Sequence, residues 1–391
     1  MNAPALPARI LCISLTPIER DARVLRQISL LAELGEVTSI GFGATPAGAA
    51  YHLRVPDGLA TLPQTPAGVA KLALRAHRAA ECGAPAARWV LEVGRDSLAA
   101  PATGWDLVVA NDARVLDLAF ALADGAPVWA DMHEWAPEER THIASWRLLV
   151  APFMVHLCDT YLPRAALVTT VSEGIVELYR DRFGVDAQLM TNAGPFRDIE
   201  ARDHEGSEIV RCVHSGAAIS GRGLESMIRA FLELPERFTL DLYLVSAGDG
   251  GEHLRQLQAL AAGDPRITFN DPVRPHELPN TLASYDLGVF WIPPTHTNAR
   301  LTLPNKFFDY VQARLGLAIG PSEEMVRELQ AYRLGVVSDT FEVADLVRSI
   351  ESIDSAQLAE FKRAAERAAR PLSFEAQSAP VRARVSELLH G

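Results

Sequence analysis

The chain has 391 residues, which suggests two or three domains, because a single hydrophobic core rarely grows to this size. Its 37 Lys and Arg residues and 49 Asp and Glu residues give a net charge of −12, which argues against general nucleic-acid binding. A hydrophobic share of 48% with 22% charged residues is typical of a globular protein and excludes a disordered one.

The sequence indicates neither a secretory signal nor a membrane-spanning helix. Residues 1–9 lack a basic segment that leads into a long apolar one, and no stretch of about 20 uncharged apolar residues occurs. The four cysteines are scattered, with no paired metal spacing and no disulfide framework. We therefore expect a cytoplasmic protein with reduced thiols.

Short apolar runs alternate with helical segments in the first half of the chain. The run 9–15 predicts a buried strand, and residues 21–34 have the apolar spacing of a helix. A mostly helical segment is predicted at 51–98. Further strands are predicted at 37–42, 107–110, 128–130 and 167–171. Strands that alternate with helices indicate a parallel sheet with right-handed crossovers.

The stretch 192–207 is turn-like and polar, and we interpret 196–207 as a linker between domains. The alternation then starts again, with strands predicted at 209–213, 240–245, 267–269, 287–291 and 317–319. Helices are predicted at 223–234, 305–313, 355–369 and 374–389. The prediction is an α/β protein with one doubly wound domain at 1–195 and another at 208–373.

A glycine-containing loop is predicted directly after the first strand of the second domain, from His214 to Gly223. A strand, a glycine loop and a helix N-terminus together form an anion site, because free N–H groups and the helix dipole point at the ligand. Arg222 stands where the helix starts and could bind a phosphate with its guanidinium. The alternative is a plain strand-to-helix turn, and the spacing does not match the dinucleotide-binding fingerprint.

The segment 303–313 contains Pro-Asn-Lys at a predicted helix start. Pro304 suits the first turn, and Lys306 would lie near a helix N-terminus, where a cation is disfavoured unless an anion sits between them. Asn305 and Asp309 are one turn apart and share a face. Only three residues of the chain are lysines, and one is Lys306. The alternative is an amphipathic helix with an exposed lysine.

The third motif, residues 130–135, follows a predicted strand of the first domain. Ligands of open α/β sheets bind at the carboxyl ends of strands, so His133 and Glu134 are placed for substrate contact. No second histidine lies at ligand spacing, and we predict no metal site. The apolar segment 146–157 is either a core helix or a helix at a bilayer interface, and we favour the core.

Together these segments resemble the retaining nucleotide-sugar glycosyltransferases of family 4. The match includes 21–35 as the first helix of the acceptor domain, 171–179 as a "V-S-E-x-I" segment and 303–310 as a "P-N-K-x-x-E-Y" signature of polysaccharide-building enzymes. The resemblance implies the GT-B architecture, in which two Rossmann-like doubly wound parallel-sheet domains face a central cleft. It also implies that the C-terminal helix at 374–391 packs back on the first domain.

The resemblance assigns roles to individual residues. Arg222 and Lys306 would contact the donor diphosphate and stabilise the leaving group, and His133 would lie next to the transferred sugar; these three are the expected catalytic residues. Other expected residues of the donor site are Gly216 against the diphosphate, Val273 beside the base, Asn305, and Asp309 on the ribose. Residues expected on the acceptor side are Glu134, Asn192 and Arg23.

The resemblance also implies sugar transfer with retention from a nucleoside-diphosphate sugar, without a metal or a resident cofactor. The acceptor would be a glycan, a lipid-linked glycan or a small molecule, and the place would be the cytoplasm or the inner face of the plasma membrane, with peripheral membrane contact. Two alternatives remain open: a catalytically weak or inactive relative that binds sugar nucleotides as a partner subunit, and a nucleotide-sugar epimerase or hydrolase.

The sequence departs from the family pattern at several positions. Leu301 stands where the first acidic residue of the second motif is usual, and Asp309 replaces the second. Ala217 stands where a basic residue is common, and Arg314 where a glycine is usual.

Overall fold

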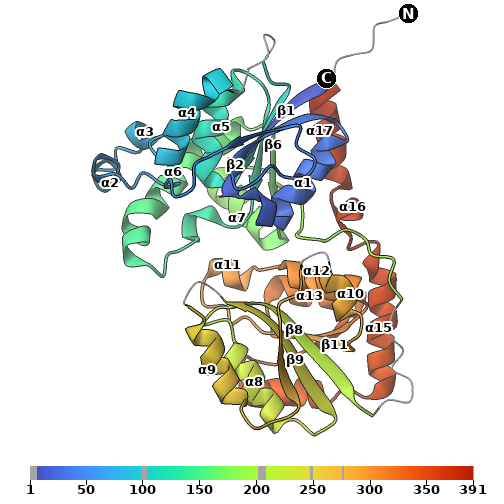
Figure 1. Ribbon diagram of the computed structural model, residues 1–391. Coiled ribbons are helices and arrows are strands. Elements are labelled where there is room, and N and C mark those ends of the chain that lie inside the picture. Colours follow the sequence, from blue (N-terminus) through green and yellow to red (C-terminus); the bar gives the residue numbers. More distant parts are fainter. Residues whose placement is uncertain (1–6, 98–103, 201–207, 247–249, 275–276, 391) are drawn as a thin grey trace, which may run out of the picture. The chain divides into compact units, whose positions relative to one another are not determined.

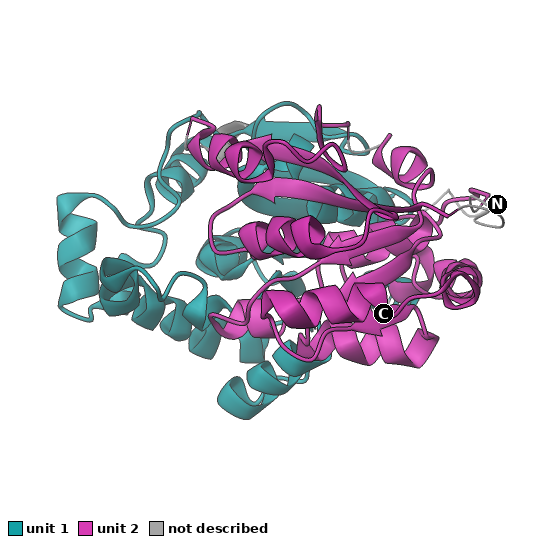
Figure 2. Cartoon of the chain, turned by 90° about the horizontal axis from the view of Figure 1, so that it is seen from below, with its two compact units in different colours: residues 1–190, 378–391 teal, residues 191–377 magenta. Residues whose placement is uncertain are grey.

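The computed structural model describes residues 7–97, 104–200, 208–246, 250–274 and 277–390, and it divides the chain into two compact units. Unit 1 comprises residues 1–190 and 378–391, and unit 2 comprises residues 191–377 (Figure 2). The division falls five residues before the predicted end of the first domain. Part of the predicted linker, 201–207, lies outside the described residues.

Unit 1 is built on a parallel sheet of seven strands in the order β3-β2-β1-β4-β5-β6-β7. The order reverses between β1 and β4, and ligands of such sheets bind outside the carboxyl ends of the strands at this point. The central strands are fully buried because helices cover both faces. The strands are β1 (Ala8–Pro17), β2 (Gly35–Phe42), β3 (Tyr51–Arg54), β4 (Leu107–Asn111), β5 (Val128–Met132), β6 (Leu167–Thr170) and β7 (Gln188–Leu189).

The helices of unit 1 follow the strands (Figure 1). They are α1 (Ala22–Ala32), α2 (Pro66–Ala73), α3 (His77–Ala80), α4 (Pro85–Ser97), α5 (Leu116–Ala123), α6 (Ala151–Tyr161), α7 (Glu173–Phe183) and α17 (Ala379–His390). Helix α1 begins after Asp21, whose side chain accepts a hydrogen bond from the Val24 N–H and caps the helix. The prediction of a mostly helical segment from residue 51 was wrong at its start, because residues 51–54 pair with β2 as β3.

Unit 2 has a parallel sheet of six strands in the order β10-β9-β8-β11-β12-β13, and its order reverses between β8 and β11. The strands are β8 (Val210–Ala218), β9 (Phe238–Ser246), β10 (Ile267–Asn270), β11 (Leu287–Phe290), β12 (Gly316–Ile319) and β13 (Gly335–Val337). Strand β8 was predicted to end at residue 213 but continues to Ala218, because 214–218 pair with β9. The predicted glycine loop therefore begins as strand.

Helices cover both faces of this sheet and form two hydrophobic cores. They are α8 (Leu224–Glu233), α9 (Glu252–Ala261), α10 (Leu278–Leu282), α11 (Thr297–Arg300), α12 (Asn305–Gln312), α13 (Glu323–Tyr332), α14 (Val343–Glu351), α15 (Ser355–Ala369) and α16 (Phe374–Gln377). A capping box of Asp354 and Gln357 starts α15. The predicted C-terminal helix is two helices, α16 and α17, which belong to different units.

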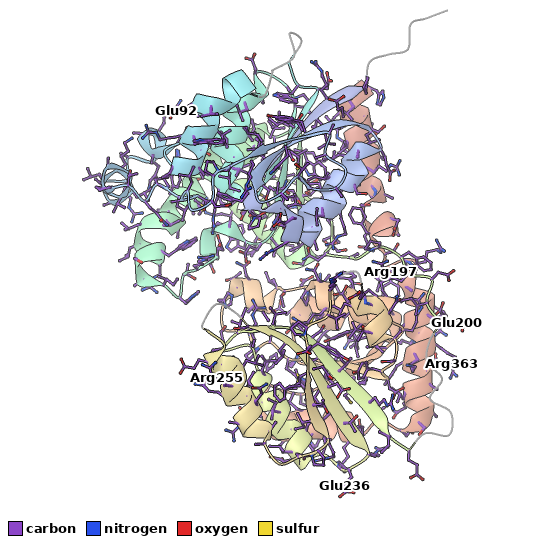
Figure 3. The ribbon with its side chains drawn as sticks, viewed as in Figure 1. Glu92, Arg197, Glu200, Glu236, Arg255 and Arg363 are labelled. Carbon is purple, nitrogen blue, oxygen red and sulfur yellow. The ribbon has the colours of Figure 1, made fainter. Side chains whose placement is uncertain are left out.

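Charged side chains such as Glu92, Glu236 and Arg255 are exposed and point away from the cores (Figure 3). Within the described residues, no helix is both long enough and apolar enough to cross a bilayer.

Candidate functional site

Lys306 reaches from the second position of α12 to the carboxyl end of β8. A Cβ atom built on Gly216 would lie 2.4 Å from the Lys306 Nζ, and Gly216 has a φ of +141°, a conformation that favours glycine. Helix α12 can lie this close to the sheet because residue 288 in β11 is also a glycine: a Cβ there would lie 2.4 Å from the Tyr310 ring. The two glycines thus create the space for the Lys306 ammonium.

The Lys306 ammonium is held in surroundings that disfavour its charge. Burial, and then the charge of Arg222, lower its pKa to about 8, although Asp309 acts in the opposite direction. Its Nζ lies 5.1 Å from the centre of the Phe290 ring. Within the described residues, no carboxylate oxygen lies within ion-pair distance of Nζ. An anion between two such cations at a helix N-terminus would be electrostatically favoured.

His214 lies beside this site on β8, and the sequence had suggested no role for it. Its Nδ1 lies 2.8 Å from the Val289 carbonyl oxygen and donates to it, and the ring stacks on Phe290 at a centroid distance of 5.8 Å. Burial, together with the charges of Lys306 and Arg222, lowers the pKa of His214 to about 3. The imidazole is therefore neutral and adds no third positive charge.

The other expected donor residues also lie in unit 2. Arg222 is exposed just before α8, and Asp309 is half-buried on α12, near Gly194. Asn305 is exposed at the first position of α12, and Val273 lies in the loop after β10.

Asn192, which was expected on the acceptor side, also lies in unit 2. Its Nδ2 donates a hydrogen bond of 3.3 Å to the carbonyl oxygen of Leu303, just before α12. Leu301, at the position of the missing acidic residue, is buried at the end of α11.

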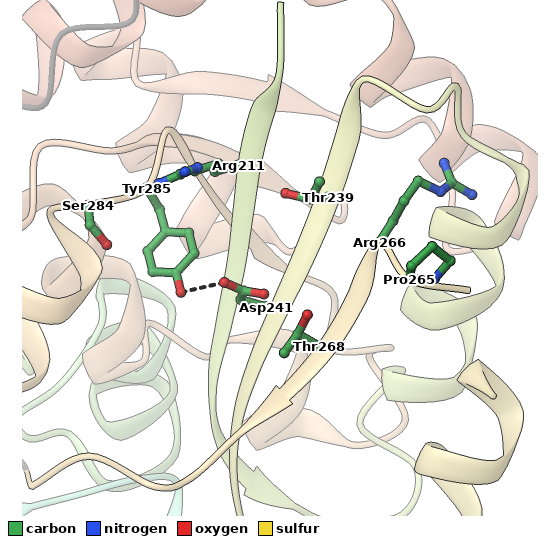
Figure 4. A pocket seen from close by; sticks show the side chains of 8 residues that line it. All are labelled: Arg211, Thr239, Asp241, Pro265, Arg266, Thr268, Ser284 and Tyr285. Atoms are coloured by element: carbon green, nitrogen blue, oxygen red, sulfur yellow. Dashed lines mark hydrogen bonds between the residues drawn. The ribbon is translucent and has the colours of Figure 1, made fainter. Parts of the chain in front are cut away.

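A separate pocket of unit 2, with a volume of about 320 Å³, lies at the amino ends of β8, β9 and β10. Figure 4 shows that Tyr285 donates a hydrogen bond to Asp241 across it, at 2.6 Å. Its other lining residues are Arg211, Thr239, Pro265, Arg266, Thr268 and Ser284. None of the expected site residues lines this pocket, which is at the opposite end of these strands from Gly216.

Unit 1 contains a buried ion pair at the carboxyl end of β5. Arg23 on α1 donates from Nε and Nη2 to the two carboxylate oxygens of Asp131, at 2.8 and 2.6 Å, and from Nη1 to the Met190 carbonyl. Gln27 and Thr169 donate to the same carboxylate, at 3.2 and 2.6 Å. Burial disfavours the Asp131 charge, but Arg23 and then His133 hold its pKa well below the usual range.

His133 is attached to this network through Nε2. That atom lies 3.1 Å from Asn111 Oδ1 and 3.5 Å from Asp131 Oδ2. Because Asn111 Nδ2 donates to Gln27, its Oδ1 must accept, and the proton sits on His133 Nε2. Burial opposes the charged imidazolium, but the hydrogen bond and charge of Asp131 outweigh it and raise the pKa of His133. The other ring nitrogen, Nδ1, forms no hydrogen bond with a described residue.

Glu134 follows His133 and lies among other carboxylates. Burial raises its pKa to about 8, with further contributions from Asp112 and Glu139. Glu139 is itself paired with Arg114. Glu134 is therefore largely protonated at neutral pH and can donate a hydrogen bond.

The structure thus brings together Arg23 and His133 in unit 1, and Gly216, Arg222, Lys306 and Asp309 in unit 2. The sequence reasoning missed His214 and Asp131, although Asp131 directly follows the strand predicted at 128–130. Within the described residues, no group of three or more His, Cys, Asp or Glu side chains could hold a metal ion.

Comparisons with known proteins support the fold. No family model matches the chain, and no curated protein matches it in sequence. Its structure is similar to Anabaena HepE in complex with UDP and glucose, at 14% identity and a TM-score of 0.66, covering 97% of this chain and 100% of that one. Sucrose-phosphate synthase from Thermosynechococcus elongatus is 14% identical, with a TM-score of 0.69, and the match covers 98% of this chain and 99% of that one. WaaG, a glycosyltransferase involved in lipopolysaccharide biosynthesis, is 11% identical, with a TM-score of 0.61, and the match covers 98% of this chain and 100% of that one. The GT-B fold class, expected from the sequence, is confirmed.

Proposed function

We propose that this GT-B chain is a glycosyltransferase that takes its sugar from a nucleoside-diphosphate sugar. The observation that carries the proposal is the pair of interacting cations, Lys306 and Arg222, at the carboxyl end of β8, where glycine keeps the backbone open. This end of β8 is beside the point where the strand order reverses, the usual ligand position in such sheets. HepE, which has a similar fold, has been crystallised with UDP and with UDP-glucose.

The proposed chemistry follows from the charge that develops during transfer. When the bond between the sugar and the β-phosphate breaks, its electrons leave with the nucleoside diphosphate, which gains negative charge. Cations already fixed in a site with little water stabilise that charge most effectively. Lys306 and Arg222 would supply this stabilisation, and the neutral His214 would leave their charge directed at the phosphates.

We further propose retention of configuration without a metal ion. The acceptor oxygen would bond to the anomeric carbon on the face that the phosphate leaves, and the departing phosphate oxygen would take the acceptor proton. No protein nucleophile is needed. Asp309 would bind the ribose and Val273 the base, while His133 would offer its Nδ1 to the sugar and Glu134 would lie on the acceptor side. Arg23 is buried and bonded to Asp131 and the Met190 carbonyl, so it would position His133 through Asp131 rather than contact the acceptor. A hexose donor, a glycan or lipid-linked acceptor and a cytoplasmic location complete the proposal.

The buried Leu301 favours a second candidate, a relative that binds sugar nucleotides but transfers poorly or not at all. An apolar side chain at this position cannot accept hydrogen bonds from a donor sugar. In that case the protein would act as the binding partner of another subunit.

Two measurements test the proposal. A thermal-shift panel of nucleoside diphosphates should give a higher Tm for at least one base, because a ligand that binds only the folded state stabilises it. Incubation with the matching nucleotide sugar and a set of acceptors should then give a glycosylated product with the donor's anomeric configuration. Binding without transfer to any acceptor would support the second candidate, and no binding at all would overturn both.

A further inference from the structure

Two stretches of unit 1, residues 58–80 and 140–158, contain no acidic residue, although the chain has 49. They contain five of its Lys and Arg residues: Lys71, Arg75, Arg78, Arg140 and Arg147. The local charge is therefore opposite to the net charge of −12.

The fold brings the two stretches together. The first contains α2, and the second contains a π-helical turn, η4 (Trp146–Val150), which packs against α2. Helices α2 and α3 protrude side by side from unit 1 in Figure 1. All five cationic side chains are exposed. Within the described residues, only Arg140 has a carboxylate at ion-pair distance, that of Glu139.

The same surface exposes large apolar side chains. Leu74 is 79% exposed and Leu148 61%, and Val69 and Ile143 are about half as exposed as Leu74. These four are among only nine large apolar side chains that are exposed in the described part of the chain. Helix α2 buries only Gly68 and Leu72, so most of its outward-facing residues are apolar, the reverse of a usual surface helix.

We propose that this surface, the basic apolar face, binds a bilayer that contains anionic phospholipids. The face consists of α2 with Leu74, Arg75 and Arg78 after it, and of η4 with Arg140 and Ile143 before it. Exposed Leu74 and Leu148 would enter the interface while the unpaired cations meet the headgroups, the pattern of a peripheral membrane surface. Of the segment 146–157, Trp146, Phe153 and Met154 are buried in the core, so its contribution to this face is made by the exposed Arg147 and Leu148. The interpretation of that segment as core is confirmed for its buried residues.

Charge favours a bilayer over a second copy of the chain as the occupant. A symmetric dimer would place the same five cations opposite one another, and like charges across an interface are unfavourable. A surface of anionic lipid matches them, and each Lys or Arg near such a surface adds to binding. The face lies in unit 1 and contains none of the proposed donor residues, so its test is independent of the test of the proposed function.

Flotation of the full chain with vesicles tests the proposal. We expect binding to phosphatidylcholine vesicles that contain phosphatidylglycerol, and little to phosphatidylcholine alone. Arg78→Glu with Arg147→Glu should lower binding at least about tenfold. Leu74→Ser with Leu148→Ser should also weaken vesicle binding. Its effect should be largest on the binding that remains at about 1 M salt, because salt screens the contribution of the charges. The matched control is Arg229→Glu with Leu232→Ser, an exposed pair on α8 in unit 2.

Unchanged Tm values in all three double variants would show that each still folds. Binding that equals wild type in both unit 1 variants, or no binding of the wild type to anionic vesicles, would overturn the proposal. Sedimentation at several protein concentrations tests the other occupant, a second copy of the chain. If the wild type forms a dimer that both unit 1 variants abolish, and binds no vesicles, the face would be assigned to a second copy.

Discussion

The Lys306 ammonium occupies the space that a side chain on residue 216 would fill. A Cβ on Gly216 would lie 2.4 Å from Nζ and 2.5 Å from Cε of Lys306. The glycine and the lysine are 90 positions apart in the sequence, yet Lys306 can hold this position only because residue 216 has no side chain. This relationship yields the first prediction.

Gly216→Ala should move Lys306 away from the end of β8 and weaken nucleoside-diphosphate binding about tenfold or more, the usual scale for one hydrogen bond to a charged group. It should also cost about 1 kcal/mol of stability through backbone strain. Gly263→Ala is the control, because Gly263 has a φ of +98° and nothing within 4 Å of the added Cβ. Calorimetric titration should show loss of affinity in the first variant alone; equal affinities would contradict the assignment.

Lys306→Met should stabilise the protein at neutral pH while it strongly weakens donor binding. The folded-state pKa of Lys306, about 8, lies below its unfolded value, so burial of the charge opposes folding. The cost is full below pH 8 and disappears as pH rises to about 10.5, where the unfolded lysine also loses its proton. We expect a gain of about 1–3 kcal/mol at pH 7, measured by urea unfolding. Lys71→Met, at an exposed site, should give no such gain.

Nucleoside-diphosphate affinity should fall as pH rises above 8. The ligand needs the charged ammonium, and above its pKa the free protein must take up a proton to bind. The decrease should approach tenfold per pH unit. In Lys306→Met, the weak remaining affinity should be flat over the same range. A flat wild-type profile between pH 8 and 9.5 would exclude Lys306 as the titrating group.

Asp131→Asn should destabilise unit 1 by about 3–5 kcal/mol, because it leaves the Arg23 charge buried without its partner. It should also lower the pKa of His133, which nuclear magnetic resonance of the imidazole can follow. Arg23→Met in the same chain should recover part of the stability and should raise the His133 pKa again in part, because the Arg23 charge lowers it. Asp159→Asn serves as the control, since the Asp159–Arg182 pair is half-exposed. An unshifted His133 pKa would mean that Asp131 does not set its charge.

The sequence predicted the alternation of strands and helices well, because apolar periodicity reflects burial in each element. It failed at β3 and at the end of β8, where short or glycine-containing strands depend on pairing with β2 and β9. Arg314 shows a subtler case: it stands where a glycine is usual, and its φ is +63°. Its guanidinium bonds to Glu366 and to the carbonyls of Gln312 and Arg197, which compensate for the strained backbone.

Local sequence could identify Lys306 and Arg222 as candidates because each stands at a predicted helix start. It could not identify the partners of Asp131, since Arg23 and Asp131 are 108 positions apart and their pairing follows from the order of the strands. The neutral state of His214 likewise depends on its burial in the fold and on cations from α12 and from the loop before α8.

The most direct test of the central claim is a calorimetric comparison of nucleoside diphosphates with nucleoside monophosphates on wild type, Arg222→Ala and Lys306→Met. The proposal predicts that wild type prefers the diphosphate of one base at least about tenfold, and that each substitution removes most of this preference while monophosphate binding changes little. A wild type that binds no nucleoside diphosphate, or variants that keep the full preference, would contradict it.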